Sequence, residues 1–250
     1  MVMPDMYFGM IANLGVVLLL VLILKTLNKV TINLTWLFGT LFILFCYFLA
    51  LFKGKELISL DLVFSDLKWN WSGKIVAITV WALVLVSLAA FKSDFKIKEA
   101  GFTFSQNEGS IKPAMLVLSL FIALQVIVTL SLGDGPNYDF ETLLYQALIP
   151  GLDEEPMFRG VLLFCFSLAV VSSRINFFGS QINIAGLLLV LLFGLVHGVM
   201  YIDGEWHLSA FRIVLTGSYG FILLWLRERT GSLVFPIVAH NMVNFVGQLV

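Results

Sequence analysis

Charged residues are scarce in this chain. Asp, Glu, Lys and Arg make up 12% of its 250 residues, whereas hydrophobic residues make up 60%. Soluble globular domains average about 25% charged and about 45–50% apolar residues. The apolar excess is too large for a single soluble core. The composition therefore predicts an integral membrane protein.

Neither sign of charge dominates, and cysteine is rare. The net charge is −1, so nothing indicates a nucleic-acid partner. The two cysteines, Cys46 and Cys165, lie in apolar runs without a CxxC spacing, and we interpret them as ordinary core residues. No basic segment precedes the first apolar run, which is long. We therefore expect that run to be a membrane helix rather than a cleaved signal peptide.

The signatures of several protease classes are absent. The sequence contains no HExxH motif, which excludes the usual zincin arrangement. It also lacks a GxSxG nucleophile elbow. The dipeptide Tyr138-Asp139 has no GxGD partner downstream, so an intramembrane aspartyl pair is not expected.

Long apolar segments predict an all-α fold, a polytopic transmembrane bundle of about eight membrane-spanning helices. A helix needs about 20 apolar residues to cross the hydrocarbon core. Segment 160–173 is too short alone and must borrow length from the residues before it. We expect one integral membrane domain over residues 1–250. The other seven candidate segments are 6–24, 31–52, 75–91, 113–132, 182–202, 208–226 and 233–250.

The connections between these segments carry most of the charge. Segment 53–74 combines lysines with Trp69 and Trp71, which is typical of the membrane interface. Segment 92–112 is polar and is expected to be an aqueous loop. The Lys and Arg distribution favours both termini outside, with Lys74 among the lysines of the outer loops.

Six polar side chains fall where lipid should surround the chain. Inserting a charged side chain at bilayer depth costs about 2.5–3.5 kcal/mol on insertion scales. Charged side chains in membrane segments therefore usually have a function. Their side chains are those of acid–base chemistry or metal binding, which predicts a buried hydrolytic site. They are Glu154, Glu155, Arg159, His197, His240 and Asn244.

The acidic stretch is expected to start a helix. Pro150 and Gly151 should break any preceding helix, and Asp153 is a good N-cap residue, which would place both glutamates in the first turn.

The two glutamates are expected to have different roles. Glu155 and Arg159 are four residues apart, in the favourable order for an ion pair. Glu154 points about 100° away and lacks this partner, so we assign chemistry to Glu154 and structure to Glu155. The alternative is that both glutamates only cap a helix at the interface.

Two further helices contribute polar residues in pairs. Phe193 and His197 share one helix face, and so do His240 and Asn244. Each polar residue alone could be a helix-packing group, because His and Asn hydrogen-bond between membrane helices. Three such helices together favour one site. We therefore expect Glu154, His197 and His240 on facing helices around one cavity.

These motifs resemble those of the CPBP family of intramembrane proteases, the CAAX-protease and bacteriocin-processing group. The matching patterns are Glu154-Glu155-x-x-x-Arg159, Phe193-x-x-x-His197 and His240-x-x-x-Asn244, in this order. The resemblance covers about residues 138–244 and implies a catalytic core at about 138–250.

The resemblance also implies roles for single residues. It implies a site in a cavity that opens to the membrane, in a bundle of eight helices. Glu154 and His197 would activate a water molecule, while His240 and Asn244 would stabilise the oxyanion. Glu155, Arg159 and Phe193 would support the site. The host would be the plasma membrane of a prokaryote. Besides lipid, the partner would be a membrane-associated peptide or a lipidated protein as substrate.

The metal requirement stays open on these residues. Glu154, His197 and His240 could hold zinc or another divalent metal as a His₂Glu set. Asn244 favours a metal-free glutamate–histidine mechanism, because asparagine is a poor zinc ligand and a good oxyanion donor.

Two other functions remain as alternatives. One is a non-catalytic binding or immunity protein of the same fold, which need not retain every catalytic group. The other is a proton-coupled transporter, which would spread polar groups along a pathway and repeat them in two halves. The polar groups here cluster in the C-terminal half, and the sequence shows no repeat.

Overall fold

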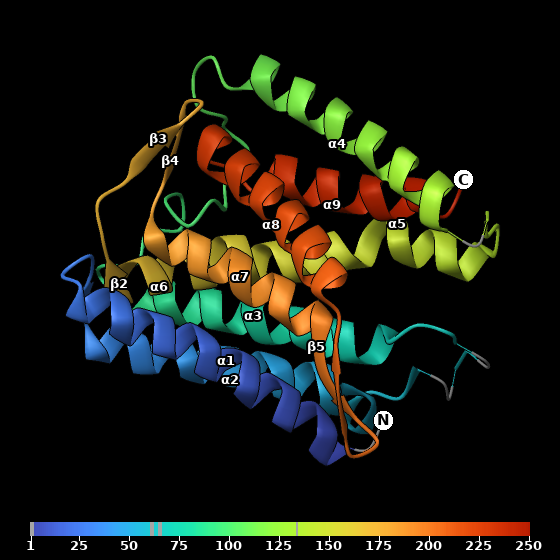
Figure 1. Cartoon of the computed structure of the whole chain (residues 1–250), viewed down its shortest axis with the longest axis horizontal. Coiled ribbons are helices and arrows are strands. Elements are labelled where there is room, and N and C mark those ends of the chain that lie inside the picture. Colours follow the sequence, from blue (N-terminus) through green and yellow to red (C-terminus); the bar gives the residue numbers. More distant parts are fainter. Residues whose placement is uncertain (1–2, 61–62, 65–66, 134) are drawn as a thin grey trace. The chain divides into compact units, whose positions relative to one another are not determined.

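The computed structural model of the chain is built mainly from helices (Figure 1). It describes residues 3–250 except 61, 62, 65, 66 and 134. A π-helix, Pro156–Leu162, joins α5 to α6. The prediction of an all-α fold is confirmed. The helices are α1 (Met3–Thr26), α2 (Leu34–Leu57), α3 (Trp71–Phe91), α4 (Ile111–Leu132), α5 (Phe140–Glu155), α6 (Leu163–Ala169), α7 (Ile184–Gly198), α8 (Ala210–Thr230) and α9 (Val234–Gly247).

Five helices in the described part of the chain are long and apolar enough to cross a membrane, namely α1, α2, α3, α4 and α8. Helices α7 and α9 have 15 and 14 residues. At about 1.5 Å per residue they fall short of a hydrocarbon core of about 30 Å. The expected number of eight spans is therefore not established. The helical path from Phe140 to Ala169 is continuous, as the short segment 160–173 required.

The apolar segment 182–202 is not one helix, which corrects the sequence prediction. Helix α7 ends at Gly198, and β5 (Val199–Ile202) pairs antiparallel with β6 (Glu205–Leu208). Asp203 and Gly204, which join the strands, have φ angles of 53° and 85°. Asp-Gly with two positive φ angles is the preferred two-residue hairpin turn. An uninterrupted apolar run does not distinguish helix from strand, so the sequence prediction extended the helix too far.

Two smaller antiparallel ladders complete the secondary structure. β1 (Thr31–Ile32) pairs with β2 (Val170–Val171), and β3 (Ile175–Phe177) pairs with β4 (Ser180–Ile182). Phe178 and Gly179 connect β3 to β4 with φ angles of 48° and 83°, again a turn with two positive φ angles.

The chain divides into two compact units, here called unit 1 and unit 2. Unit 1 comprises Met1–Leu41 and Cys165–Trp225, and unit 2 comprises Phe42–Phe164 and Leu226–Val250. Within unit 1, α1 packs against α7 and β5. Within unit 2, α9 packs against α5 and α4, and α3 packs against α5 and the π-helix. A single domain stays a prediction.

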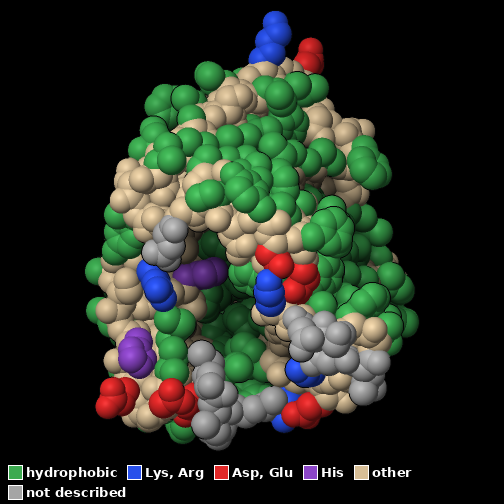
Figure 2. Space-filling view, turned by 90° about the vertical axis from the view of Figure 1, so that its right-hand side faces the viewer, with side chains coloured by type: hydrophobic (Ala, Val, Ile, Leu, Met, Phe, Trp, Pro, Cys, Tyr) green, Lys and Arg blue, Asp and Glu red, His purple; other side chains and the backbone are tan. Residues whose placement is uncertain are grey.

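Many large apolar side chains lie on the surface. On α4, for example, Leu116, Leu120, Ile127 and Leu130 are 61–69% exposed. Hydrophobic side chains cover much of the face that Figure 2 shows. Large exposed apolar areas are rare on soluble monomers and typical of surfaces that meet other apolar material. Together with the five apolar helices, they identify an integral membrane protein.

Helix α5 begins at a cluster of polar contacts from segment 67–71. The Asp139 side chain accepts a hydrogen bond from the Thr142 N–H, at 3.0 Å, and so caps the helix. Lys68 Nζ, which donates to the same carboxylate, and Thr142 together lower the pKa of Asp139 to about 2. Glu141 accepts hydrogen bonds from the backbone N–H groups of Lys68 and Trp69. The cap is therefore ionised at any ordinary pH.

Helix α5 passes through Pro150 and Gly151 without a break, contrary to the expected helix start near Asp153. The reason is a side chain from α9. Asn241 Oδ1 accepts a hydrogen bond from the Gly151 N–H at 2.7 Å, and Asn241 Nδ2 donates to the Leu148 carbonyl at 3.1 Å. A proline within a helix removes one backbone hydrogen bond and displaces the preceding turn. The amide of Asn241 serves backbone groups on both sides of that defect.

Glycine is required at position 151 by this helix crossing. A Cβ atom there would lie 2.6 Å from the Ile237 carbonyl oxygen of α9. Because the backbones approach so closely, the Asn241 amide can reach α5.

The helical path widens directly after the glutamates. Pro156 begins the π-helix, and all residues from Pro156 to Leu162 are buried. A widened turn accommodates a proline ring that would otherwise press on the carbonyl of the preceding turn. Glu154 and Glu155 therefore end α5 within a continuous path. The argument that a helix N-terminus stabilises them was wrong.

Replacing Asn241 with alanine should destabilise the protein, whereas the same change at Asn244 should not. Asn241→Ala leaves the buried Gly151 N–H without its partner from α9, at about 1–3 kcal/mol, and also removes the hydrogen bond to the part-buried Leu148 carbonyl. The side chain of Asn244 makes no hydrogen bond to another residue in the part of the chain that the structure describes. Thermal unfolding in detergent should show a clearly lower Tm for Asn241→Ala alone. Equal Tm values for the two variants would contradict this account of α5.

Candidate active site

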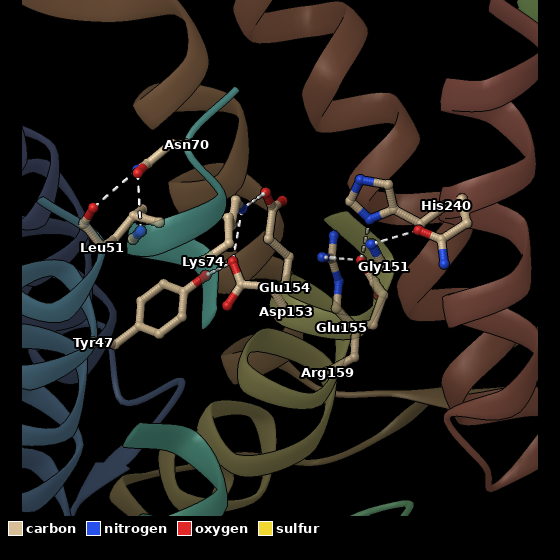
Figure 3. A network of polar contacts seen from close by, with 12 residues as sticks. Tyr47, Leu51, Asn70, Lys74, Gly151, Asp153, Glu154, Glu155, Arg159 and His240 are labelled. Carbon is tan, nitrogen blue, oxygen red and sulfur yellow. Dashed lines mark hydrogen bonds and ion pairs between the residues drawn. The ribbon is translucent and has the colours of Figure 1, made fainter. Parts of the chain in front are cut away.

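Three consecutive carboxylates form the centre of the candidate site in unit 2. Asp153, Glu154 and Glu155 end α5, and polar partners approach them from two sides (Figure 3). Lys74 and Tyr47 contact Asp153 on one side, where Lys74 also reaches Glu154. Arg159 and His240 contact Glu155 on the other.

Lys74 is the cation on the first side. Its Nζ donates to Asp153 Oδ2 and to Glu154 Oε1, each at 2.7 Å. The Tyr47 hydroxyl of α2 donates to Asp153 Oδ2 at 2.8 Å. The sequence prediction gave Glu154 no ion-pair partner of its own, and the structure provides Lys74. The partner lies 80 residues earlier in the chain, so a local pattern does not reveal it.

Two neighbouring residues determine where Lys74 lies. The Asn70 side chain accepts a hydrogen bond from the Gly73 N–H at 3.0 Å, which caps α3 one turn before Lys74. Gly73 lies against α2, since a Cβ atom at Gly54 would come within 2.7 Å of its Cα. Lys74 therefore belongs to the first turn of α3 and is buried, which corrects its assignment to an outer loop.

Glu155 forms the second contact group. Its Oε1 accepts from Arg159 Nη1 at 2.9 Å and lies 2.8 Å from His240 Nδ1. The spacing of four residues between Glu155 and Arg159 thus gives the predicted ion pair. Beside an ionised carboxylate, His240 Nδ1 carries the proton and donates, so reactions of the ring fall to Nε2.

The three carboxylates differ in their accessibility. The side chains of Asp153 and Glu155 are 0% exposed, and that of Glu154 is 17% exposed. Two of the three acids are thus enclosed by protein. Glu154 is the one that water or a substrate can reach.

His197 lies in unit 1, in the last turn of α7. Its Nδ1 lies 2.7 Å from the Phe193 carbonyl oxygen and therefore donates to it. The two rings are 4.7 Å apart. His197 is exposed, and its other nitrogen, Nε2, carries the lone pair of the neutral ring. Its expected position on a cavity shared with Glu154 and His240 stays a prediction.

Asn244 lies one turn beyond His240 on α9 and is partly exposed. The neighbouring Asn241 is buried and holds α5, a role that the sequence prediction missed. The only signal for it was the pair Pro150-Gly151, which requires hydrogen bonds from outside its own helix.

Within the described residues, no group of three or more His, Cys, Asp or Glu side chains could hold a metal ion. Of the three predicted ligands, unit 2 contains Glu154 and His240, and unit 1 contains His197. The ammonium group 2.7 Å from Glu154 repels a second cation at this carboxylate. The donor set of unit 2 therefore fits a metal poorly.

Comparison with known proteins supports the motif pattern. Residues 136–246 match a family described as type II CAAX prenyl endopeptidase Rce1-like. The matched region contains all three motifs and confirms the resemblance to CPBP proteases. The members of that family are described as endopeptidases of the CAAX type. No curated protein and no solved structure matches the chain.

Arg159→Ala should destabilise the protein more than Glu154→Gln. Without Arg159, the buried Glu155 loses its cation, and breaking a buried ion pair in this way costs about 3–5 kcal/mol. Glu154→Gln keeps the size of a partly exposed side chain and leaves the Lys74–Asp153 contact in place. Thermal unfolding in detergent, with wild type alongside, provides the measurement. Equal melting temperatures for both variants would contradict the structural assignment of Glu155.

Proposed function

We propose that this membrane protein, whose residues 136–246 match the Rce1-like family, is an intramembrane endopeptidase with Glu154 as its general base. Its substrate is a prenylated protein or peptide at the membrane, in keeping with the description of the family. The host membrane is the plasma membrane of a prokaryote.

The accessibility of Glu154 carries this proposal. Its carboxylate lies between two fully buried acids, each of which is occupied by partners from other helices. A general base must come within hydrogen-bonding distance of the proton that it removes. Among the three acids, only Glu154 is exposed enough to meet that condition.

The proposed reaction begins with a water molecule that Glu154 and His197 activate. One O–H bond of the water breaks, and its proton passes to the Glu154 carboxylate while the oxygen bonds to the peptide carbonyl carbon. His197 accepts the second hydrogen bond of the water through Nε2. The C–N bond then breaks, and the proton held by Glu154 passes to the leaving amine.

The oxyanion of the tetrahedral intermediate is stabilised from α9. In this proposal His240 donates a hydrogen bond to the oxyanion from Nε2, while its Nδ1 contacts Glu155 Oε1 at 2.8 Å and so orients the ring. Asn244, one turn further on, offers a second donor through its amide. Donors already in position for developing charge are usually the largest contribution to such catalysis.

A metal is not required for these steps. If one were bound, Glu154, His197 and His240 would be its ligands, and it would supply Lewis-acid activation of the water. The charge of Lys74 beside Glu154 favours the metal-free version.

Purified full-length protein should cleave farnesylated peptides that end in a CAAX sequence. We expect Glu154→Gln to lower turnover by at least roughly 10²–10⁴-fold, the usual contribution of a general base. Mass spectrometry of the products of farnesylated and plain peptides provides the measurement. Glu108→Gln, the same change at an exposed loop residue, serves as the control. Full turnover by Glu154→Gln, or no cleavage by wild type, would contradict the proposal.

Asn244→Ala should lower the turnover rate by roughly 10²–10³-fold, the scale for the loss of one oxyanion donor. KM should barely change, because this hydrogen bond strengthens only in the transition state. Steady-state kinetics on the cleaved peptide give both values.

Chelator treatment separates the two mechanisms on the same preparation. Turnover should persist after thorough chelation, with metal content measured alongside. Stoichiometric zinc whose removal and return track the activity would contradict the metal-free mechanism.

A further inference from the structure

We infer that Lys74 is a positioning residue for the reaction, which holds the Glu154 carboxylate in place and in its charged form. The inference rests on the proposed function, since it takes Glu154 as the base. The juxtaposition that carries it is one ammonium group shared by two consecutive carboxylates, Asp153 and Glu154.

The contacts place Lys74 firmly. Its Nζ lies 2.7 Å from one oxygen of each acid, and the lysine side chain is 11% exposed. Burying a lysine is costly unless its charge is paired. The methylene chain also loses rotamer freedom on burial, which adds to the cost. A packing role alone does not require a cation here, because an apolar side chain of this length would fill the same space.

The charges explain why two acids share one cation. Lys74, Asp153 and Glu154 together carry a net charge of −1. When Glu154 takes a proton from water, Lys74 and Asp153 remain as a neutral pair. The cluster therefore accepts the proton without leaving a lone cation in an apolar site, which would be costly.

Tyr47 keeps Asp153 in its place during this change. Its hydroxyl donates to the same Asp153 oxygen that Lys74 contacts, at 2.8 Å. Asp153 is thus held from α2 and α3 together, whichever charge Glu154 carries. The ammonium group of Lys74 then contacts the fixed carboxylate of Asp153 on one side and the reactive carboxylate of Glu154 on the other.

A purely structural ion pair between α3 and α5 makes a different prediction. Loss of such a pair would change stability, and kcat would follow only the fraction of folded protein. A positioning role changes the chemical step in the folded protein. It should lower kcat and leave KM nearly unchanged, because substrate binding does not use Lys74.

The test uses full-length protein in detergent, a fluorogenic farnesylated CAAX peptide and the variant Lys74→Met. Its kcat, corrected for folded fraction, should fall more than tenfold, with KM within threefold of wild type. The matched control is Lys53→Met, since Lys53 pairs with Glu56 on an exposed part of α2. A smaller fall in kcat overturns the inference.

If Lys74→Met does not fold, the double variant Lys74→Met with Asp153→Asn provides the test. It removes one charge of each sign and keeps the net charge of the cluster at −1. If Lys74 serves only to neutralise Asp153, the double variant recovers kcat to within tenfold of wild type, and the inference is overturned. If Lys74 positions Glu154, kcat stays more than tenfold lower in folded protein.

A second readout does not depend on cleavage. Dicyclohexylcarbodiimide labels protonated carboxyl groups in apolar sites, and peptide mass spectrometry locates the labelled residue. Without Lys74, Glu154 takes up a proton more readily and should be labelled faster in Lys74→Met than in wild type. Unchanged labelling overturns the inference. Wild type that cleaves no peptide contradicts the proposed function instead, and labelling still decides whether Lys74 controls the charge of Glu154.

Discussion

Pairing of charge inside an apolar protein is the constraint on which this structure depends. Three consecutive acids end α5, and an isolated ionised carboxylate in an apolar medium is very costly. Lys74 of α3 and Arg159 of the π-helix supply the opposite charge. Tyr47 and His240 supply further hydrogen bonds from α2 and α9. The helices of unit 2 therefore surround the acidic turn because that turn requires partners.

The need to pair buried charge also gives the three acids different roles. Asp153 and Glu155 are enclosed by partners and serve to hold Lys74 and His240. Glu154 shares a cation but retains some exposure. The cluster thus contains two acids that are fixed by their partners and one acid that is accessible. A site whose reactive side chain must be held in position needs such supporting groups.

Local relations in the sequence were predictable, and distant ones were not. The Glu155–Arg159 pair follows from a spacing of four residues on one helix. The contact of His197 with Phe193 has the same spacing. Lys74 and Asn241 were missed because their partners lie 79 and 90 residues away in the chain. For the same reason, the helix break expected at Pro150 was wrong. Apolar length predicted membrane helices well, but it did not separate the end of α7 from β5.

The hairpin after α7 limits how the chain length can vary near His197. Val199 pairs with Leu208, and the Ser209 N–H donates to the Gly198 carbonyl at 2.8 Å, so the hairpin closes directly on the helix end. One extra residue in either strand would shift the register and turn every later side chain to the opposite face. The start of α8 at Ala210, beside the end of α7, is thus coupled to the lengths of the two strands. Insertions that keep the register are therefore confined to the Asp203-Gly204 tip, so the lengths of β5 and β6 are fixed by the fold while the length of the tip is not.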